Sequence, residues 1–311
     1  MGHQPYGERM MMYKRMLGII CTLVLAANPA VTSAVENLSF GVYTSNKPTA
    51  MVKQFRPVLN AIEAHMSKTL GDEVKIRIQV AQNYEQGVQH LTNGKVDFSR
   101  FGPASYVMAK KANPDLEILA LESKNGQKTA NGVICVHSSS TIEDVSGLKG
   151  KRFAFGDEQS TIGRFLSQNY LAKNGVFAAD LNHYDYLGRH DKVGTSVGAG
   201  TYEGGALNES TFKKLVAKGE PIRAIAKFPN VAKPWIARSG LSTRIMDAMR
   251  AALLNMDDPV ALKSLKRDGF LPGTDSDYAV IRESIEKNHV FFGVDMDGVS
   301  IEKKQTAKSA Q

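Results

Sequence analysis

The sequence predicts an α/β protein made of two lobes. Short β-prone runs alternate with helix-prone runs along most of the chain, and this alternation is typical of mainly parallel sheets flanked by helices. The alternating runs form two sets, separated by the polar, Gly-containing segment 123–132, and the residues from Leu241 onward are mostly helix-prone. We therefore expect 35–125 and 240–311 to form lobe I and 126–239 to form lobe II. Such a chain crosses twice between its lobes, which makes a hinge and a cleft.

The elements follow from the alternating runs in chain order. For lobe I we expect a strand at 37–44, a helix running to about residue 69, a strand at 74–81, a helix at 86–91, a strand at 95–102, a helix from Pro103 and a strand at 116–123. For lobe II we expect strands at 133–139, 151–156, 183–188 and 202–207, with helices at 161–173, 190–197 and 210–218. Helices within 242–256, 259–269 and 277–288 complete the chain. Pro57 indicates that the first helix either kinks or begins there.

The first residues indicate export. Lys14 and Arg15 precede the apolar run MLGIICTLVLAA, which is followed by small residues. A basic region, a short apolar region and small residues describe a secretory signal peptide, and a membrane span needs about 20 apolar residues. We expect residues 1–34 to be this peptide, with cleavage after Ala34 and the mature protein in the periplasm. Cys21 does not follow a small residue, which argues against a lipoprotein anchor; an uncleaved anchor stays open as an alternative.

Composition narrows the partners. Residues 1–34 hold three basic residues and one acidic residue, so their removal changes the net charge from +8 to +6. The remaining charges are scattered and aromatic residues do not interleave with them, so nucleic acid is not an expected partner. A mildly positive field suits a small anionic ligand or an acidic membrane surface. Cys135 is then the only cysteine, so no intramolecular disulfide can form, and its apolar strand predicts a small buried side chain.

Catalytic motifs are missing from the sequence. There is no G-x-S-x-G elbow at DEQSTIG, the seven histidines include no HExxH, and a single cysteine cannot build a zinc site. The stretch GAGTYEGG at 198–205 has the spacing GxGxxxG, which is not that of a dinucleotide-binding turn. We therefore expect no catalytic residues, no metal and no cofactor. An enzyme on the same fold remains a less favoured alternative.

The stretch AFGDEQSTIGRFLSQNYL, at 153–170, contains a turn with two possible roles. A strand ends before Gly156, and the following helix begins with Ser160 and Thr161. The first four N–H groups of a helix have no partner within it. One interpretation is an ordinary N-cap, because Ser is among the best capping residues. The other is a socket for an anion at the helix end.

Two more helix starts carry hydroxyl groups. In FSRFGPASYVMAKKA the helix begins at Pro103, with Ser105 and Tyr106 in its first turn, and in YTSNKPTAM, Thr44 and Ser45 precede a helix. Each start by itself predicts a capping turn. Because each follows a strand, we expect all three to converge on the crevice at the carboxyl ends of the strands. Helix dipoles and free amides there favour a negative ligand.

Four motifs, in this order and spacing, carry a family resemblance: VDFSRFGPASYVMA, LKGKRFAFGDEQSTIGRFL, GRHDKVG and DSDYAVIRESI. Over about residues 37–290 the chain resembles the periplasmic phosphate/phosphite/phosphonate-binding proteins of ABC importers. The resemblance implies a type II periplasmic-binding fold, with a phosphonate-like group held in the ligand cleft between the lobes. It also implies an inner-membrane ABC permease as partner.

The same resemblance implies a set of ligand contacts. Residues at positions that match the family's motifs are Tyr43 or the adjacent Thr44 and Ser45, Tyr84, Tyr106, Ser160, Thr161 and His190. The stretch around Tyr84 equally predicts an ordinary helix start. His190 can donate hydrogen bonds to an oxyanion, which would raise its pKa, although a lone histidine is more often a surface or core residue.

One segment departs from the family pattern. Where relatives carry acidic residues that hold a ligand ammonium, TYEGGALNESTF offers Asn208 and Glu209. Further on, FPNVAKPWIAR lacks an acidic position and contains Lys233. These differences count against 2-aminoethylphosphonate as the ligand.

The sequence thus predicts a periplasmic solute-binding protein. The helix starts at Ser105 and Ser160 would grip the oxyanion, while His190 and Glu209 would set its surroundings. Micromolar binding needs about 8 kcal/mol, so four to six charge-assisted hydrogen bonds of about 1.5–3 kcal/mol each are required, not one helix cap. The alternative is a sensor subunit that passes its closed state to a membrane signalling protein.

Overall fold

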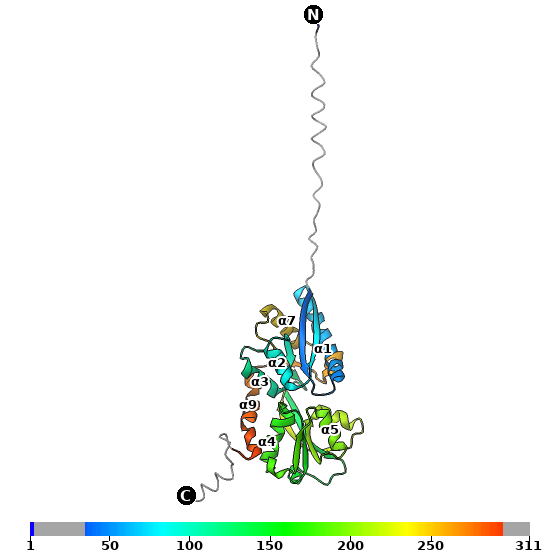
Figure 1. The fold of residues 1–311 in the computed structure, drawn as a ribbon. Coiled ribbons are helices and arrows are strands. Elements are labelled where there is room, and N and C mark those ends of the chain that lie inside the picture. Colours follow the sequence, from blue (N-terminus) through cyan, green and yellow to red (C-terminus); the bar gives the residue numbers. More distant parts are fainter. Residues whose placement is uncertain (3–34, 295–311) are drawn as a thin grey trace, which may run out of the picture. The chain divides into compact units, whose positions relative to one another are not determined.

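Residues 1–2 and 35–294 are described by the computed structural model of this chain. The predicted signal peptide lies outside these residues, except for its first two. From Val35 on, the described chain contains two β-sheets with flanking helices (Figure 1), which confirms the predicted α/β class.

Lobe I is the sheet with strand order β11-β4-β10-β3-β1-β2, together with the helices packed around it. Its strands are β1 (Val35–Tyr43), β2 (Glu73–Ala81), β3 (Phe98–Arg100), β4 (Glu117–Ser123), β10 (Pro234–Ala237) and β11 (Gly269–Leu271). Its helices are α1 (Pro48–Leu70), α2 (Tyr84–Thr92), α3 (Pro103–Ala112), α7 (Thr243–Leu254) and α8 (Pro259–Leu265). Helix α1 runs through Pro57 without ending, so this proline does not mark its start.

Lobe II is the sheet with strand order β7-β6-β8-β5-β9 and its helices. Its strands are β5 (Thr129–His137), β6 (Arg152–Phe155), β7 (His183–Tyr186), β8 (Gly204–Asn208) and β9 (Ile222–Val231). Its helices are α4 (Leu166–Lys173), α5 (His190–Gly198) and α6 (Glu209–Val216). A π-helical turn, Thr161–Phe165, leads directly into α4, so the predicted helix 161–173 is present in two parts.

Most strands of each sheet run in one direction, as expected, and each sheet also contains antiparallel strands. Strand β1 pairs in parallel with β2 and β3, but β10 runs antiparallel to β3 and β4, and β11 antiparallel to β4. In lobe II, β6 is parallel to β7 and β8, whereas β5 is antiparallel to β8 and β9. The reason is the crossing between lobes. Strands that precede a helix run towards one edge, while β5 and β10 enter their sheets from that edge and run away from it.

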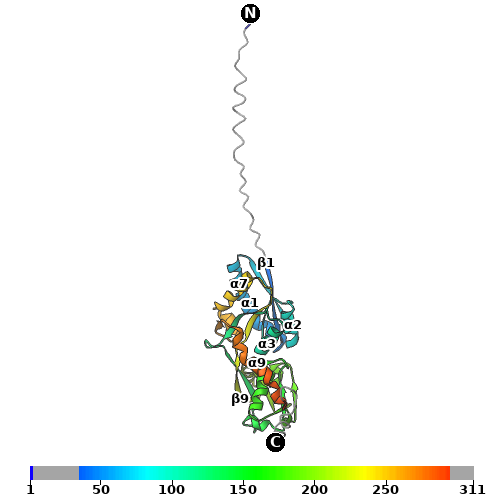
Figure 2. The same ribbon diagram turned by 90° about the vertical axis from the view of Figure 1, so that its left-hand side faces the viewer.

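The chain crosses between the lobes at two pairs of strands and again near its end. The first crossing joins β4 to β5, and the second joins β9 to β10 through Ala232 and Lys233. Because β10 lies in the first sheet, the return to lobe I occurs shortly before the predicted residue 240. Helix α9 (Ala279–Glu286) then contacts α3 (Figure 2) and α4 (Figure 1), and Phe291 packs with its ring 5.7 Å from that of Phe155 in lobe II.

Each lobe has its own aromatic core. In lobe I, Trp235 is fully buried, stacks on Phe40 at 5.1 Å and meets Phe270 edge-on at 5.8 Å. In lobe II, Phe155 is fully buried and lies 4.7 Å from Phe153 between their ring centres. Burial of such rings is the main source of stability in cores of this kind.

The register of the parallel strands places several turns at one edge. Tyr43 at the end of β1 lies beside Ala81 at the end of β2, and Ser99 of β3 pairs with Gly41. The residues that follow these strands therefore begin helices close together, as expected for the carboxyl edge of an α/β sheet. Among the described residues, no helix combines the length and the apolar character that a membrane crossing requires.

Candidate functional site

A small cavity lies where the carboxyl edges of the two sheets meet. We call it the inner cavity. Its lining residues come from both lobes and from the second crossing: Tyr43, Tyr84, Gly102, Pro103, Ser160, Thr161, Ile162, His190, Asn208, Asn230 and Lys233. About 20 Å³ of this cavity is open to the centres of water molecules, so the cavity is small.

The lobe I wall is built on a tyrosine pair. The rings of Tyr43 and Tyr84 stack with their centres 3.9 Å apart. The Tyr43 hydroxyl accepts a 2.6 Å hydrogen bond from the Gly102 amide and lies 3.0 Å from Ser105 Oγ. A Cβ on Gly102 would lie only 3.1 Å from the Tyr43 hydroxyl, so glycine allows this close approach. Burial raises the pKa of Tyr43 to about 12, so its phenol stays neutral and keeps its proton for donation.

The lobe II wall is the turn at Ser160. Ser160 Oγ accepts a 3.0 Å hydrogen bond from the Gly163 amide, which confirms the N-cap interpretation. The Gly163 backbone packs against Gly156, where an added Cβ would come within 2.7 Å of the Gly156 Cα. This contact explains the glycine at the helix start. The N–H groups of Thr161 and Ile162 lie ahead of the capped amide and have no acceptor within the helix.

The start of α3 in lobe I and the Thr161 turn in lobe II contact each other between the lobes. The amide of Ala104, in the first turn of α3, donates a 2.8 Å hydrogen bond to Thr161 Oγ1. One predicted socket therefore contacts the other directly. The convergence that the strand–helix order predicted is present for these two turns.

Several buried polar groups in the cavity have no partner. His190 is 4% exposed and Asn230 is 5% exposed. Within the described part of the chain, neither His190 Nδ1 nor either polar side-chain atom of Asn230 makes a hydrogen bond. Native proteins leave few buried polar atoms unpaired, because each costs about 1–3 kcal/mol. These side chains therefore point to a polar ligand that supplies the missing partners.

Lys233 adds a half-buried cation to the same wall. Its backbone carbonyl accepts a 3.1 Å hydrogen bond from the Glu122 amide, which fixes its place at the second crossing. Burial, and next the nearby Arg100 guanidinium, lower the pKa of Lys233 well below its usual value, although Glu122 opposes this shift. A bound anion would reverse the shift by stabilising the ammonium.

The pKa of His190 is lower than expected for a histidine that binds an anion. Burial, and next the Lys233 ammonium, lower the pKa of His190 from 6.5 to about 3. The ring is therefore neutral near pH 7, with one N–H available as a donor. The predicted increase in pKa requires a bound anion.

We expect protonation of His190 to destabilise the fold at acid pH. Its folded pKa of about 3 lies below 6.5, so between these values the unfolded chain binds more protons. Stability should therefore fall as the pH decreases from 6.5 towards 3, by up to about 1.4 kcal/mol per pH unit. Urea unfolding at pH 7 and pH 4.5 measures this slope, which His190→Gln should flatten. His65→Gln, on α1, should keep the original slope, and an unchanged slope in His190→Gln would contradict the prediction.

Three other residues predicted from the sequence, Tyr106, Thr44 and Ser105, do not line the inner cavity. The Tyr106 hydroxyl donates a 2.6 Å hydrogen bond to Asp275, away from the cavity lining, because the residue after Ser105 points to a different face of α3. The hydroxyl of Thr44 binds the Gln82 carbonyl, which ties it to the turn after β2. Ser105 contacts the site only through Tyr43.

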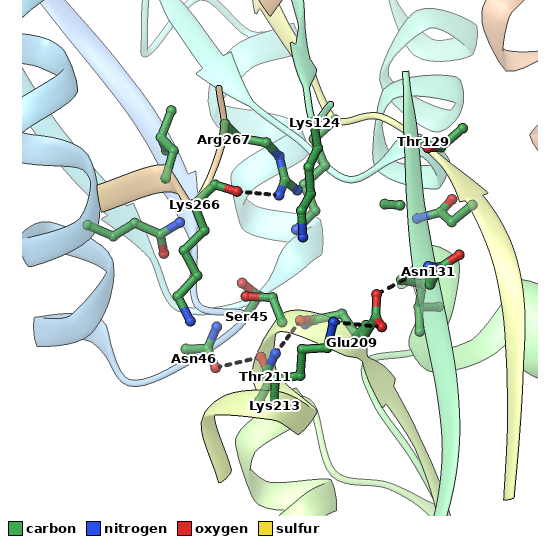
Figure 3. Close-up of a pocket in the computed structure, with 18 of the residues that line it drawn as sticks. Ser45, Asn46, Lys124, Thr129, Asn131, Glu209, Thr211, Lys213, Lys266 and Arg267 are labelled. Atoms are coloured by element: carbon green, nitrogen blue, oxygen red, sulfur yellow. Dashed lines mark hydrogen bonds and ion pairs between the residues drawn. The ribbon is translucent and has the colours of Figure 1, made fainter. Parts of the chain in front are cut away.

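A second cavity adjoins the first, and we call it the outer cavity (Figure 3). It offers about 150 Å³ to the centres of water molecules and shares Ile162, Asn208, Asn230 and Lys233 with the inner cavity. Ser45 and Glu209 line this cavity and not the inner one.

Glu209 already has partners. Its carboxylate lies 3.0 Å from Lys213 Nζ and 3.3 Å from Lys227 Nζ, and it accepts a 3.1 Å hydrogen bond from Asn131. Partial burial favours the neutral acid, but the Lys213 and Asn131 hydrogen bonds outweigh it and hold the pKa at about 2. The Glu209 carboxylate therefore already pairs with two lysines, so it is poorly placed to bind a ligand ammonium.

Among the lining residues outside the predicted set, Asn230 and Lys233 carry polar side chains that can bind a ligand. Asn230 lies near the end of β9, and Lys233 lies in the second crossing, between β9 and β10. The available signal was a single lysine between Ala232 and Pro234, in an otherwise apolar stretch. Local pattern alone does not show that this stretch passes the cleft.

The chemistry of the site is that of binding. Its lining presents hydroxyl, amide, imidazole and ammonium groups, and it contains no carboxylate in the inner cavity. In the described part of the chain there is no group of three or more His, Cys, Asp or Glu side chains that could hold a metal ion. Such a donor-rich, small cavity suits an oxyanion.

Comparison with known proteins agrees with this geometry. Residues 40–278 match the family model described as "ABC transporter, phosphonate, periplasmic substrate-binding protein". The chain belongs to this family. The family resemblance, the type II periplasmic-binding fold and the assignment to solute binding are thereby confirmed, and the family is one of periplasmic transport proteins.

Individual relatives support the same assignment. The probable ABC transporter phosphite binding protein PhnD1 of Prochlorococcus marinus (strain MIT 9301) is 27% identical over 248 residues, covering 73% of this chain and 80% of the relative. Its solved structure, in complex with methylphosphonate, has a TM-score of 0.72 at 23% identity and covers 81% of this chain and 98% of its own. A binding protein component of an ABC phosphonate transporter from Pseudomonas aeruginosa has a TM-score of 0.70 at 18% identity, covering 90% and 100%.

Proposed function

We propose that this periplasmic substrate-binding protein captures a small phosphonate, phosphite or phosphate-like oxyanion in the inner cavity and delivers it to an inner-membrane ABC permease. We further propose that residues 1–34 are a cleaved signal peptide. The observation that carries the ligand proposal is the set of buried, unpaired polar groups that face one small cavity, above all His190 and Asn230.

In this proposal the oxyanion is held by donors from both lobes. The free N–H groups at the start of the Thr161 turn and the Tyr43 hydroxyl lie on opposite walls, while His190 and Lys233 supply further donors. Hydrogen bonds to a charged ligand contribute about 1.5–3 kcal/mol each, and binding costs ordering and lost translation. Five such contacts near the upper end of this range reach micromolar affinity, about 8 kcal/mol, after a binding cost of about 4 kcal/mol is subtracted.

The proposed ligand also explains how closure would depend on binding. Thr161 Oγ1 accepts a hydrogen bond from Ala104, so the lobes have direct contact at the cavity. An anion between the two helix starts would bond to both and favour this closed arrangement over an open one. The two pairs of strands that join the lobes would serve as the hinge.

Ser160→Ala combined with Thr161→Ala tests this proposal. We expect methylphosphonate at a hundred times its dissociation constant to stabilise the parent protein by about 2.7 kcal/mol, and the double variant by almost nothing. The variant loses its N-cap, which costs about 1–2 kcal/mol, so its fold is checked by circular dichroism. Thermal unfolding with and without ligand measures both effects.

Ser242→Ala is the matched control. Ser242 caps α7 through a 3.4 Å hydrogen bond from the Ile245 amide and lies outside both cavities. Its loss should lower stability by a similar amount and leave the ligand-induced stabilisation intact. If the Ser160/Thr161 double variant binds methylphosphonate with unchanged affinity, this turn is not part of the site.

A further inference from the structure

The outer cavity is strongly basic. Its lining contains one carboxylate, that of Glu209, against six basic side chains: Arg100, Lys124, Lys213, Lys233, Lys266 and Arg267. These cations come from separate parts of the chain, so their proximity is a product of the fold and not of a basic run in the sequence.

Carboxylates compensate only half of these cations. Glu122 pairs with Arg100 at 2.7 Å and with Arg267 at 3.0 Å. Glu209 pairs with Lys213 at 3.0 Å. The remaining cations, Lys124, Lys233 and Lys266, have no ion-pair partner within the described residues.

Asp268, which follows Arg267 in the sequence, does not pair with these lysines either. Asp268 accepts hydrogen bonds from Ser123 Oγ, at 3.1 Å, and from the Asn125 amide, so it is occupied by the turn after β4. In Figure 3, Lys124 and Lys266 both extend into the cavity above Ser45 and Asn46. Two ammonium groups therefore approach one space without a fixed counterion from the described chain.

The basic outer cavity is continuous with the proposed oxyanion site. Asn208, Asn230 and Lys233 line both cavities. Asn230 is 5% exposed, and neither of its polar side-chain atoms makes a hydrogen bond in the described structure. A ligand that fills only the inner cavity would leave the ammonium groups of Lys124 and Lys266 facing water.

We propose that the preferred ligand is a phosphonate with a second anionic group on its substituent, either a carboxylate or a second phosphoryl group. This inference rests on the proposed function. The phosphonate group occupies the inner cavity, the substituent passes Asn230, and the second oxyanion lies between Lys124, Lys233 and Lys266.

The charge of the substituent distinguishes these ligands from other phosphonates. Complementary charges favour binding, whereas like charges placed close together disfavour it. A 2-aminoethyl substituent would bring its ammonium towards unpaired lysines, and the lining carboxylate Glu209 already contacts Lys213 and Lys227. A plain alkyl substituent would bury little, because Ser45, Asn46 and Thr211 make much of the wall polar.

Isothermal titration calorimetry with four phosphonates tests the inference on the purified protein. The probes are propylphosphonate, 3-phosphonopropionate, 2-aminoethylphosphonate and methylenediphosphonate. We expect 3-phosphonopropionate or methylenediphosphonate to bind about tenfold more tightly than propylphosphonate in low salt, and 2-aminoethylphosphonate to bind more weakly than all of them. The preference should decrease as salt is added, because Lys124 and Lys266 are solvent-exposed. The two anionic probes distinguish a carboxylate from a second phosphoryl group.

Lys124→Gln combined with Lys266→Gln connects the preference to these residues. The affinity ratio of the better dianionic probe to propylphosphonate should fall from about tenfold to about twofold. Lys68→Gln combined with Lys111→Gln removes the same charge from exposed positions outside both cavities and should leave the ratio unchanged.

Three outcomes overturn the inference in different ways. If propylphosphonate binds as tightly as both dianionic probes, the second anionic group is not recognised, while the proposed function stands. If none of the four phosphonates binds, the proposed function fails and this inference fails with it. If both double variants lower the affinity ratio equally, the preference depends on net charge alone. Lys124 and Lys266 would then not form the proposed site.

Discussion

Lys233→Met is expected to weaken methylphosphonate binding by at least about 30-fold, because truncating one partner of a desolvated charge pair costs about 2–5 kcal/mol. Lys233 lines both cavities, and burial lowers its pKa well below the usual value, so a bound anion is the partner that makes its charged form favourable. Calorimetric titration at neutral pH measures the loss.

Stability should respond differently from affinity in the same variant. Lys233 has no ion-pair partner within the described residues, and Met keeps most of its apolar stem. Removing a half-buried, unpaired charge should leave the free energy of unfolding unchanged or increase it. Lys218→Met, at an exposed position outside the cavities, should change neither quantity. If Lys233→Met binds methylphosphonate as tightly as the parent protein, Lys233 is not part of the proposed site.

Glu122→Gln is expected to lower the free energy of unfolding by about 3 kcal/mol, the lower end for breaking a buried ion pair. The Glu122 side chain is fully buried and contacts two guanidinium groups, those of Arg100 at 2.7 Å and Arg267 at 3.0 Å. Gln keeps the shape but leaves both cations without their counterion. Urea unfolding at pH 7 measures the difference.

The pH dependence of the same variant gives a second readout. Burial raises the pKa of Glu122, but the Arg100 and Arg267 guanidinium groups outweigh it and hold the pKa at about 2, below 4.5. The stabilisation from this carboxylate is therefore complete above 4.5 and is lost as the pH falls towards 2. Glu122→Gln should remove this loss.

A surface pair provides the control. Glu73 lies 3.0 Å from Lys75, but both side chains are more than half exposed. Glu73→Gln should therefore cost less than about 0.5 kcal/mol. If Glu122→Gln costs no more than Glu73→Gln, the buried pair does not support the lobe I wall of the outer cavity.

The sequence was informative where structure depends on local chemistry. Alternating strand and helix patterns predicted the α/β class, and the Ser160 hydroxyl at a helix start predicted the N-cap that the structure shows. The proximity of the α3 start and the Thr161 turn also followed, because carboxyl ends of parallel strands share one edge. The pattern did not indicate which strands run antiparallel, because β5 and β10 enter their sheets from the cleft.

What the sequence alone determined about this protein was its fold class, its family and the hydroxyl-bearing turns that approach the site, because these depend on patterns within a few residues. The tertiary structure decided which side chains have no partner. Only the packing of the second crossing against both lobes shows that Asn230 and Lys233 line the cavity, that burial keeps His190 neutral, and that Glu209 is held by other residues. Desolvation and charge pairing depend on residues far apart in the chain, so no local pattern records them.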